Sequence, residues 1–260
     1  MSDIKSVEYK GVCYKILSDS DHNDYLNLSG LGIEDITEVK NLEKLKTLKS
    51  LVLKDNKITK ITGLENLINL EILILNGNSI RKIGGLDNLK KLKLLSLNEC
   101  KHIKKIEGLN FLGILRDLKL RDNEISETSG LNSLHKLEDL DLSRNRIKEL
   151  TNLSNLKQLI QINLSNNQIQ DMRGLQALSN LKRLNLHGNQ IKVVKCLEKL
   201  VKLEELIITN NPVEKIDNYE SLKNLWTITI NTDRLPYFEF SKFTTHFRPG
   251  RDDDYFPKIS

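Results

Sequence analysis

The stretch LVLKDNKITKITGLENLINL (51–70) decides the fold, because LILNGNSIRKIGGLDNLKKL (73–92) repeats it with Leu, Asn and Ile in the same places. With Leu48 as its first residue, one unit reads LxxLxLxxNxIxxIxxLxxL, and the next unit begins at Leu70, 22 residues later. A fixed period of this length is typical of a stack of similar building blocks, each of which buries its apolar face against its neighbours.

Eight such units follow one another without a linker, and they begin at Leu48, Leu70, Leu92, Leu115, Leu137, Leu159, Leu181 and Leu203. The step from Leu92 to Leu115 contains one extra residue, because Cys100-Lys101-His102-Ile103 stands where other units have Asn-x-Ile. A single inserted residue at the exit of a strand predicts a local bulge or a looser turn.

The spacing inside each unit predicts its local structure. Leu51 and Leu53 alternate with outward residues, which indicates a short strand with one buried face. An Asn follows three residues later and marks a turn, where its amide is expected to bind backbone groups that the strand leaves unpaired. Stacking predicts a structural ladder of these residues, Asn56, Asn78, Asn123, Asn145, Asn167, Asn189 and Asn211.

The second half of each unit returns the chain to the next strand. Apolar residues at every third position, such as Ile61, Leu64 and Leu67, predict a short helical or 3₁₀ segment. The glycine at one equivalent place in most units predicts a tight backbone step on entry to that segment, at Gly63, Gly85, Gly108, Gly130 and Gly174.

Both ends of the repeat depart from the pattern. Residues 1–47 are predicted to form an N-terminal cap, with two short strands around Lys10-Gly11 and a degenerate first strand near Leu26. Residues 48–224 hold the eight repeats, and 225–260 are predicted to form a C-terminal cap and an aromatic-rich segment. Trp226 is expected to cover the last repeat, with a binding role as the alternative, and the aromatic segment either packs on the stack or binds a partner.

These units resemble the leucine-rich repeat of the 22-residue class over roughly residues 26–230. The resemblance implies an α/β solenoid, with a curved parallel β-sheet on the concave side and short helical or 3₁₀ segments on the convex side. Within the family, the repeats are similar to those of a regulatory subunit of protein phosphatase 1 and of bacterial internalins.

Composition narrows the function classes. The 40 Lys and Arg nearly balance the 35 Asp and Glu, which argues against a dedicated nucleic-acid or membrane face. The N-terminus has no apolar core of the kind that signal peptides need, and no membrane span is expected, so the sequence predicts a cytoplasmic protein with free thiols at Cys13, Cys100 and Cys196. Catalytic and nucleotide-binding motifs are absent, so neither an enzyme nor a metal or cofactor is expected.

Outward residues between the strand leucines are not dictated by the repeat, so function is expected there. The predicted partner-binding residues are Val52, Ile72, Ile74, Leu94, Asp117, Lys119, Arg121, Asp139, Asp141, Arg183, Asn185, His187, Glu205 and Ile207. The first four form an apolar patch and the next five a charged centre, in which Lys119 is expected to pair across strands with Asp141. Asp117 and Asp139 are close enough to share a cation or a proton, but a flat sheet does not exclude water as a catalytic pocket does.

The sequence therefore predicts a monomeric, non-enzymatic module or scaffold that binds a protein partner on its concave face. Two alternatives stay open. One is a regulatory subunit of a protein phosphatase or small-GTPase system, and the other is a structural solenoid that associates with itself.

Overall fold

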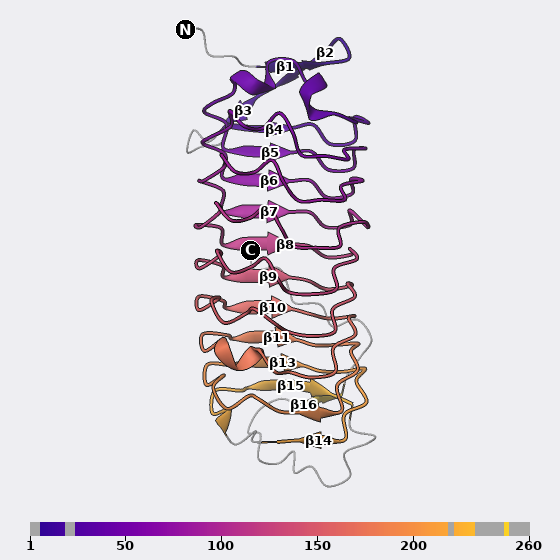
Figure 1. Ribbon diagram of the computed structural model, residues 1–260, viewed down its shortest axis with the longest axis vertical. Coiled ribbons are helices and arrows are strands. Elements are labelled where there is room, and N and C mark those ends of the chain that lie inside the picture. The colour runs from indigo at the N-terminus through magenta and orange to yellow at the C-terminus, as the bar shows by residue number, and fades with distance from the viewer. Residues whose placement is uncertain (1–5, 19–23, 218–220, 232–246, 250–260) are drawn as a thin grey trace.

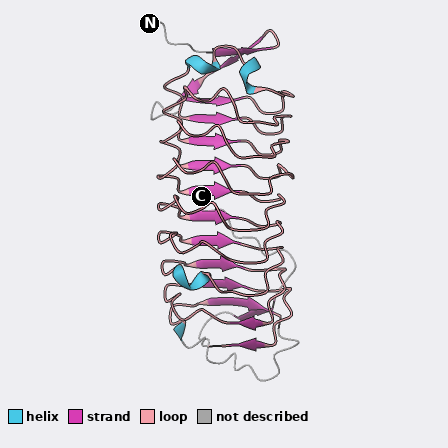
Figure 2. Ribbon diagram, viewed as in Figure 1, coloured by secondary structure: helices cyan, strands magenta, loops and turns pink. Residues whose placement is uncertain are grey.

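The structure, a computed structural model, describes residues 6–18, 24–217, 221–231 and 247–249. It is a single stack of short strands with the repeats in sequence order (Figure 1; Figure 2). Neighbouring repeat strands are parallel, so the predicted solenoid fold is confirmed. The repeat strands are β5 (Ser50–Val52), β6 (Ile72–Ile74), β7 (Leu94–Ser96), β8 (Asp117–Lys119), β9 (Asp139–Asp141), β10 (Gln161–Asn163), β11 (Arg183–Asn185) and β13 (Glu205–Ile207).

The sheet continues beyond these repeats at both ends. At the N-terminal end, β4 (Asp24–Asn27) pairs in parallel with β5, and β3 (Leu17–Ser18) adds an antiparallel edge. At the other end, β15 (Thr227–Ile230) and β16 (Phe247–Pro249) extend the parallel order. The sheet thus has 12 strands, and the rest of the predicted aromatic-rich segment lies outside the described residues.

The N-terminal hairpin forms where the sequence predicts it. Strand β1 (Ser6–Tyr9) pairs antiparallel with β2 (Val12–Lys15), and the turn residues Lys10 and Gly11 have φ of 49° and 79°. Positive φ at both central residues matches the turn that joins right-twisted strands through two residues. The outer edge of β1 is also covered, because Glu8 exchanges backbone hydrogen bonds with Lys40.

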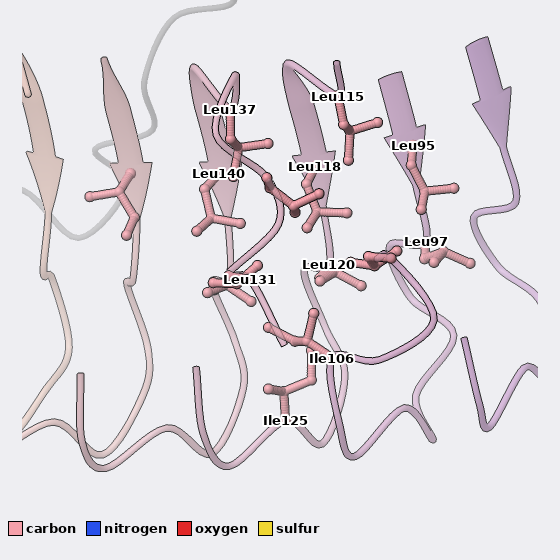
Figure 3. Packing of buried hydrophobic residues seen from close by; sticks show 14 of the residues in the cluster. Leu95, Leu97, Ile106, Leu115, Leu118, Leu120, Ile125, Leu131, Leu137 and Leu140 are labelled. Atoms are coloured by element: carbon pink, nitrogen blue, oxygen red, sulfur yellow. The ribbon is translucent and has the colours of Figure 1, made fainter. Parts of the chain in front are cut away.

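The core is a continuous column of aliphatic side chains (Figure 3). In each strand the middle residue points inward, and Leu118 and Leu140 are fully buried between neighbours of the same kind. Complete burial of a leucine stabilises a fold by about 1.5–3 kcal/mol. Since each unit contributes several such residues, stacking stabilises units that are too small to fold alone.

The return segments contain less helix than the sequence predicts. Three 3₁₀ helices lie wholly within the described residues, η1 (Ile36–Glu38), η2 (Leu42–Lys44) and η3 (Leu175–Ala177), and no described residue is α-helical. Elsewhere single turns repeat, as where the N–H groups of Leu67 and Leu70 donate to carbonyls three residues earlier at 2.9 Å. The return stretch of a 22-residue unit is short, so single turns with one inward-facing residue each can bury its apolar side chains without a continuous helix. A further parallel pair, β12 (Val193–Val194) and β14 (Lys215–Ile216), lies outside the main sheet.

The tight backbone step that the recurring glycine predicts has a clear physical cause. Gly85 has a φ of +69°, and a Cβ there would overlap the carbonyl oxygen of Ile61 in the preceding unit. The backbones of successive units therefore touch at this place, and glycine avoids both the strain and the overlap. Asn152 and Cys196 occupy the same place with φ of 58° and 62°, whereas Asn218 lies outside the described residues.

Across the described ranges, no helix has the length and apolar character needed to cross a bilayer.

Candidate partner-binding face

The side chains that alternate with the buried leucines form two rows on one face of the sheet, called here the open face. Strand pairing sets their order. The first row is Tyr25, Ser50, Ile72, Leu94, Asp117, Asp139, Gln161, Arg183, Glu205 and Thr227. The second row is Asn27, Val52, Ile74, Ser96, Lys119, Asp141, Asn163, Asn185, Ile207 and Thr229.

An apolar patch occupies the N-terminal part of the open face and consists of Tyr25, Val52, Ile72, Ile74 and Leu94. The four aliphatic members are half-buried, and Tyr25 is 37% exposed. The sequence argument placed the aliphatic residues here but missed Tyr25, because it counted outward positions only from the first regular unit. Pairing of Tyr25 with Ser50 puts the aromatic ring in the same row.

The ion pairs of the charged centre differ from those predicted. Lys119 lies opposite Asp141 in the pairing of β8 with β9, yet its ammonium group bonds diagonally to Asp139. The expected Lys119–Asp141 pair is therefore wrong. A lysine side chain is long enough to reach the diagonal neighbour on an adjacent strand.

Asp117 is the acidic residue of the charged centre that lacks a direct partner within the described part of the chain. Within the described part of the chain, its carboxylate has neither a hydrogen bond nor an ion pair, although it is half-buried between Leu94 and Asp139. Burial raises the pKa of Asp117, and the negative charge of Asp139 raises it further. Its charged form is therefore under-stabilised on the free surface.

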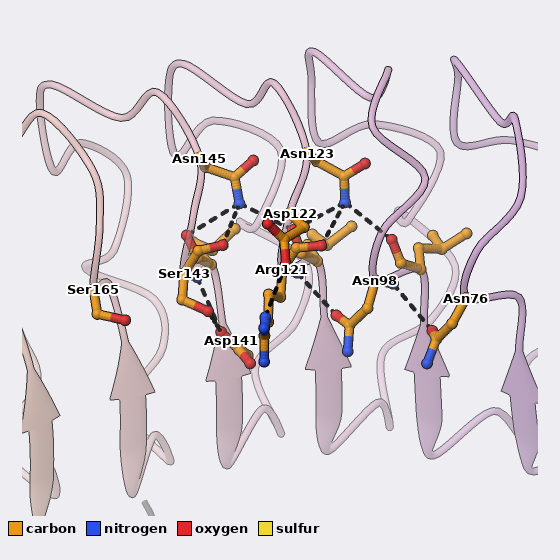
Figure 4. Close-up of polar contacts among 12 residues, drawn as sticks. Asn76, Asn98, Arg121, Asp122, Asn123, Asp141, Ser143, Asn145 and Ser165 are labelled. Carbon is orange, nitrogen blue, oxygen red and sulfur yellow. Dashed lines mark hydrogen bonds and ion pairs between the residues drawn. The ribbon is translucent and has the colours of Figure 1, made fainter. Parts of the chain in front are cut away.

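Asp141 and Asn185 bond to the backbone at the exits of their own strands, a role that their prediction as contact residues did not include; Figure 4 shows Asp141 beside Ser143. Asp141 Oδ1 accepts hydrogen bonds from the Ser143 N–H at 2.9 Å and the Ser143 hydroxyl at 2.7 Å. Asn185 Oδ1 accepts from the His187 N–H at 3.0 Å. Short polar side chains that bind the backbone two residues on are typical of turns, and here they end the strand.

In two earlier units, the N–H group at the same place after the strand is bonded by an asparagine of the preceding unit instead. Asn76 Oδ1 accepts from the Asn98 N–H at 3.0 Å, and Asn98 Oδ1 accepts from the Arg121 N–H at 2.8 Å. The second-row residues of these two units are Ser96 and Lys119. The Ser96 hydroxyl donates to Asn76 Oδ1 at 2.6 Å, and a lysine ammonium group cannot accept a hydrogen bond, so the acceptor for the N–H comes from the preceding unit in both cases.

The C-terminal part of the open face is largely paired or buried. Arg183 Nε lies 3.8 Å from Glu205 Oε2, and His187 Nδ1 lies 2.6 Å from the Thr209 hydroxyl. Ile207 is only 3% exposed and Asn185 only 2%, so the prediction that both offer contact surface is wrong. Their burial leaves this end of the open face less accessible than the sequence pattern indicates.

Arg121 also has an intramolecular partner. Its Nε donates to Asp122 Oδ2 at 3.0 Å within its own strand exit. The charge of Arg121 at the edge of the charged centre is therefore compensated by Asp122.

The asparagines at the turn make the same set of contacts in each regular unit. Asn145 Nδ2 donates to the carbonyls of Leu120, Leu142 and Ser143 at 3.0–3.1 Å, and its Oδ1 accepts from the Ile125 N–H at 3.0 Å. Equivalent bonds run through Asn56, Asn78, Asn167, Asn189 and Asn211, and Asn123 makes the donor bonds of this set. Each side chain thereby links two successive units and holds the open face rigid.

Cys100 replaces asparagine in this ladder. Its thiol is buried, lies 3.6 Å from the Leu75 carbonyl oxygen, and has a pKa raised to about 11 by burial. The extra residue before Ile103 also has an effect on the next unit. Asn123 Oδ1 is buried and, among the described residues, has no hydrogen-bond partner, whereas Asn145 Oδ1 has one. The predicted local irregularity therefore costs the ladder one bond.

A ladder of opposite charges flanks the first row and was missed by the sequence argument. Glu71 lies between Lys49 and Lys93, and hydrogen bonds from both lysines lower the pKa of its carboxyl. The pairs Arg116–Glu138 and Lys182–Glu204 continue the pattern at 2.8 and 2.9 Å. The signal was present in the sequence as charged residues directly before most strands, with acidic and basic residues in neighbouring units.

Trp226 occupies the same place in the last unit and is 53% exposed. The expectation that it covers the end of the stack is wrong, because Leu225 and Ile228 are the residues buried there. Trp226 instead borders a surface pocket together with Lys182, Lys202, Glu204 and Asn224. A charged residue fills this place in most other units, so the pattern favoured an outward side chain.

No group of three His, Cys, Asp or Glu residues suited to a metal ion occurs in the part of the chain that the structure describes. Asp117 and Asp139 are neighbours, but they lie on the open face rather than in a pocket. The three cysteines are free, as predicted.

Comparison with known proteins supports the repeat assignment. The family model for leucine-rich repeats in two copies matches residues 68–110, 136–178, 157–200 and 179–224, which together make up more than half of the chain. A comparison with curated protein sequences finds no match.

Solved structures with the same fold include two internalins of Listeria monocytogenes. Internalin InlF is 31% identical, with 80% of this chain and 60% of that chain covered and a TM-score of 0.72. Internalin C2 is 27% identical, with 80% of both chains covered and a TM-score of 0.63. The complex of TLR13 with ssRNA13 is 26% identical over 75% of this chain and 31% of the receptor, with a TM-score of 0.64.

The chain thus spans 60% of the length of InlF. The phosphatase type of repeat is not among these matches, whereas the general repeat is found by both the family model and the structures. On its periodic sequence, its stacked parallel strands and these matches, this chain belongs to the leucine-rich repeat family.

Proposed function

We propose that this chain is a non-enzymatic cytoplasmic module that binds a protein partner on the open face of its sheet. The observation that carries the proposal is the apolar patch. Its five side chains lie on four adjacent strands, β4 to β7, at places where charged or amide side chains stand in most later units. A contiguous apolar surface on a soluble protein is typical of an interaction site.

Rigidity of the open face supports the same role. The asparagine ladder and the Asn76–Asn98 bond tie successive units together, and Asp141 fixes the end of its own strand. A preformed surface loses little conformational freedom on binding, so more of the contact free energy appears as affinity.

The charge of the open face favours protein over nucleic acid. Among its two rows, Lys119 and Arg183 are the cations, while Asp117, Asp139, Asp141 and Glu205 are anions. Nucleic-acid binding depends mainly on cations that neutralise phosphates, so an excess of carboxylates opposes it.

The test is a pull-down from native extract that compares the wild type with the double variant Ile72/Ile74→Asp. A matched control is Ile68/Ile114→Asp, because both isoleucines are exposed, at 50% and 43%, but lie outside the strands. Circular dichroism first establishes that each variant is folded. A partner that binds the wild type and the control but not the open-face variant supports the proposal.

Other outcomes discriminate among the alternatives. Capture of a phosphatase catalytic subunit or a small GTPase through the open face would make the module a regulatory subunit. A mass that grows with concentration in light scattering, and only for proteins with an intact patch, would make a second copy the partner. Equal capture by the wild type and the open-face variant would refute the proposal.

A further inference from the structure

At the edge where the apolar patch meets the charged centre, aliphatic surface lies beside a carboxylate that has no direct partner. In the first row, Ile72 and Leu94 are followed on the next strand by Asp117. Adjacent strands are about 4.8 Å apart, so the carboxylate lies about 5–10 Å from the two aliphatic side chains. Apolar surface and an unpaired anion are thus within reach of one short segment of a partner.

The cations around Asp117 are already engaged. Lys119 bonds to Asp139, Arg116 bonds to Glu138 at 2.8 Å, and Lys93 bonds to Glu71. The charges of Lys119 and Arg116 lower the pKa of Asp117 in part, but both side chains bond to other carboxylates, and burial and Asp139 outweigh their effect. A half-buried carboxylate gains more from a cationic partner than one in free solvent, because water screens the interaction less.

We propose that the open face recognises a peptide segment of a protein partner in which an aliphatic or aromatic side chain is accompanied by a lysine or arginine two to four residues away. This inference rests on the proposed function. The apolar side chain packs in the patch between Tyr25 and Leu94, and the basic side chain pairs with Asp117. In an extended segment, residues two apart on one side are separated by about 7 Å, which fits the separation on the sheet.

The raised pKa of Asp117 is consistent with this assignment. Burial by the surrounding sheet and the charge of Asp139 both disfavour the carboxylate, and an incoming cation relieves the second effect directly. Charge complementarity of this kind selects among partners, because a segment with an acidic residue at the same place is repelled.

The experiment is selection of a phage-displayed library of random 12-residue peptides on the wild type, on Ile74→Asp and on Asp117→Asn. Asp141→Asn is the matched control, since it removes the same charge one strand away while an amide keeps the strand-ending bond, as Asn185 does. Enriched peptides are synthesised with and without a Lys→Gln or Arg→Gln change. Their affinities are measured by fluorescence anisotropy.

The expected result is that the wild type and Asp141→Asn enrich peptides with a basic residue close to an apolar one. Replacing that basic residue should weaken binding to the wild type by roughly tenfold, in line with a hydrogen bond to a charged group, and should hardly change binding to Asp117→Asn. Ile74→Asp should abolish binding.

Two results overturn the inference in distinguishable ways. If binding needs Ile74 but the basic residue matters equally for the wild type and Asp117→Asn, the pairing with Asp117 is wrong while the proposed function stands. If the peptides bind Ile74→Asp as well as the wild type, or none is enriched, both the pairing and the open-face site are wrong.

Discussion

Asn145→Ala tests whether the asparagine ladder holds the repeats together. The substitution removes the acceptor for the Ile125 N–H. The Leu120 and Leu142 carbonyls keep bonds from the neighbouring ladder residues Asn123 and Asn167. One buried N–H group is thus left unsatisfied, which predicts a loss of about 1–3 kcal/mol in the free energy of unfolding.

Asn123→Ala provides an internal comparison of the same chemistry. Asn123 Oδ1 is buried without a partner among the described residues, so its removal deprives no N–H group of an acceptor. The Leu120 carbonyl still accepts from Asn145, but the Leu97 carbonyl loses the bond from Asn123, and the described residues offer it no second side-chain donor. Each variant therefore leaves one buried backbone group unsatisfied, and we expect Asn123→Ala to cost about as much as Asn145→Ala, about 1–3 kcal/mol.

Urea titration followed by circular dichroism measures the free energy of unfolding of both variants. The midpoints can be compared if the dependence of this free energy on urea concentration is the same, because it reports the surface exposed on unfolding. Both variants should unfold at a clearly lower urea concentration than the wild type and at midpoints close to each other. A wild-type midpoint for either variant would refute the hydrogen bonds assigned to that asparagine.

Other perturbations give further expected outcomes. Gly130→Ala should lower the melting temperature, because φ is +87° there and a Cβ would overlap the preceding unit, whereas Gly113→Ala in open space should be tolerated. Ellman's reagent should modify exposed Cys13 in the folded protein but reach Cys100 only on unfolding, because its thiol is buried with a pKa of about 11. Asp117→Asn should raise the melting temperature at neutral pH and lose this advantage below pH 3.8, the ordinary pKa of the group. The reason is that the pKa of Asp117 is raised in the folded state, so ionisation of its carboxyl destabilises the fold as the pH rises from the ordinary pKa through the raised one. Equal melting temperatures of the variant and the wild type at neutral pH would contradict this.

Periodicity made most of the fold predictable. Strand positions, the buried leucines and the turn asparagines recur every 22 residues, so one correct alignment places all of them at once. The hairpin around Lys10 and Gly11 followed from local turn chemistry. Less predictable were the return segments, since apolar residues three apart suit both a 3₁₀ helix and a chain of single turns.

The candidate site was predictable only as a face. Side-chain alternation identified Ile72, Ile74 and Leu94 as outward, but it did not reveal that Ile207 and Asn185 are buried near the other end. Spacing along one strand carries no information about what covers a residue from outside that strand. Trp226 illustrates the same limit, since size and apolar character suggested a cover for the core while the structure places it at an exposed edge.

By itself the sequence determined the solenoid, its strand register and its ladder, because these follow from a repeated pattern in which each unit meets only its neighbours. Only the tertiary structure decided how the charges are shared. Lys119 could pair with either Asp139 or Asp141 on the next strand, and its choice of Asp139 leaves Asp117 unpaired beside the apolar patch. Long, flexible side chains select partners through distances in space, and these distances exist only once the strands have been stacked.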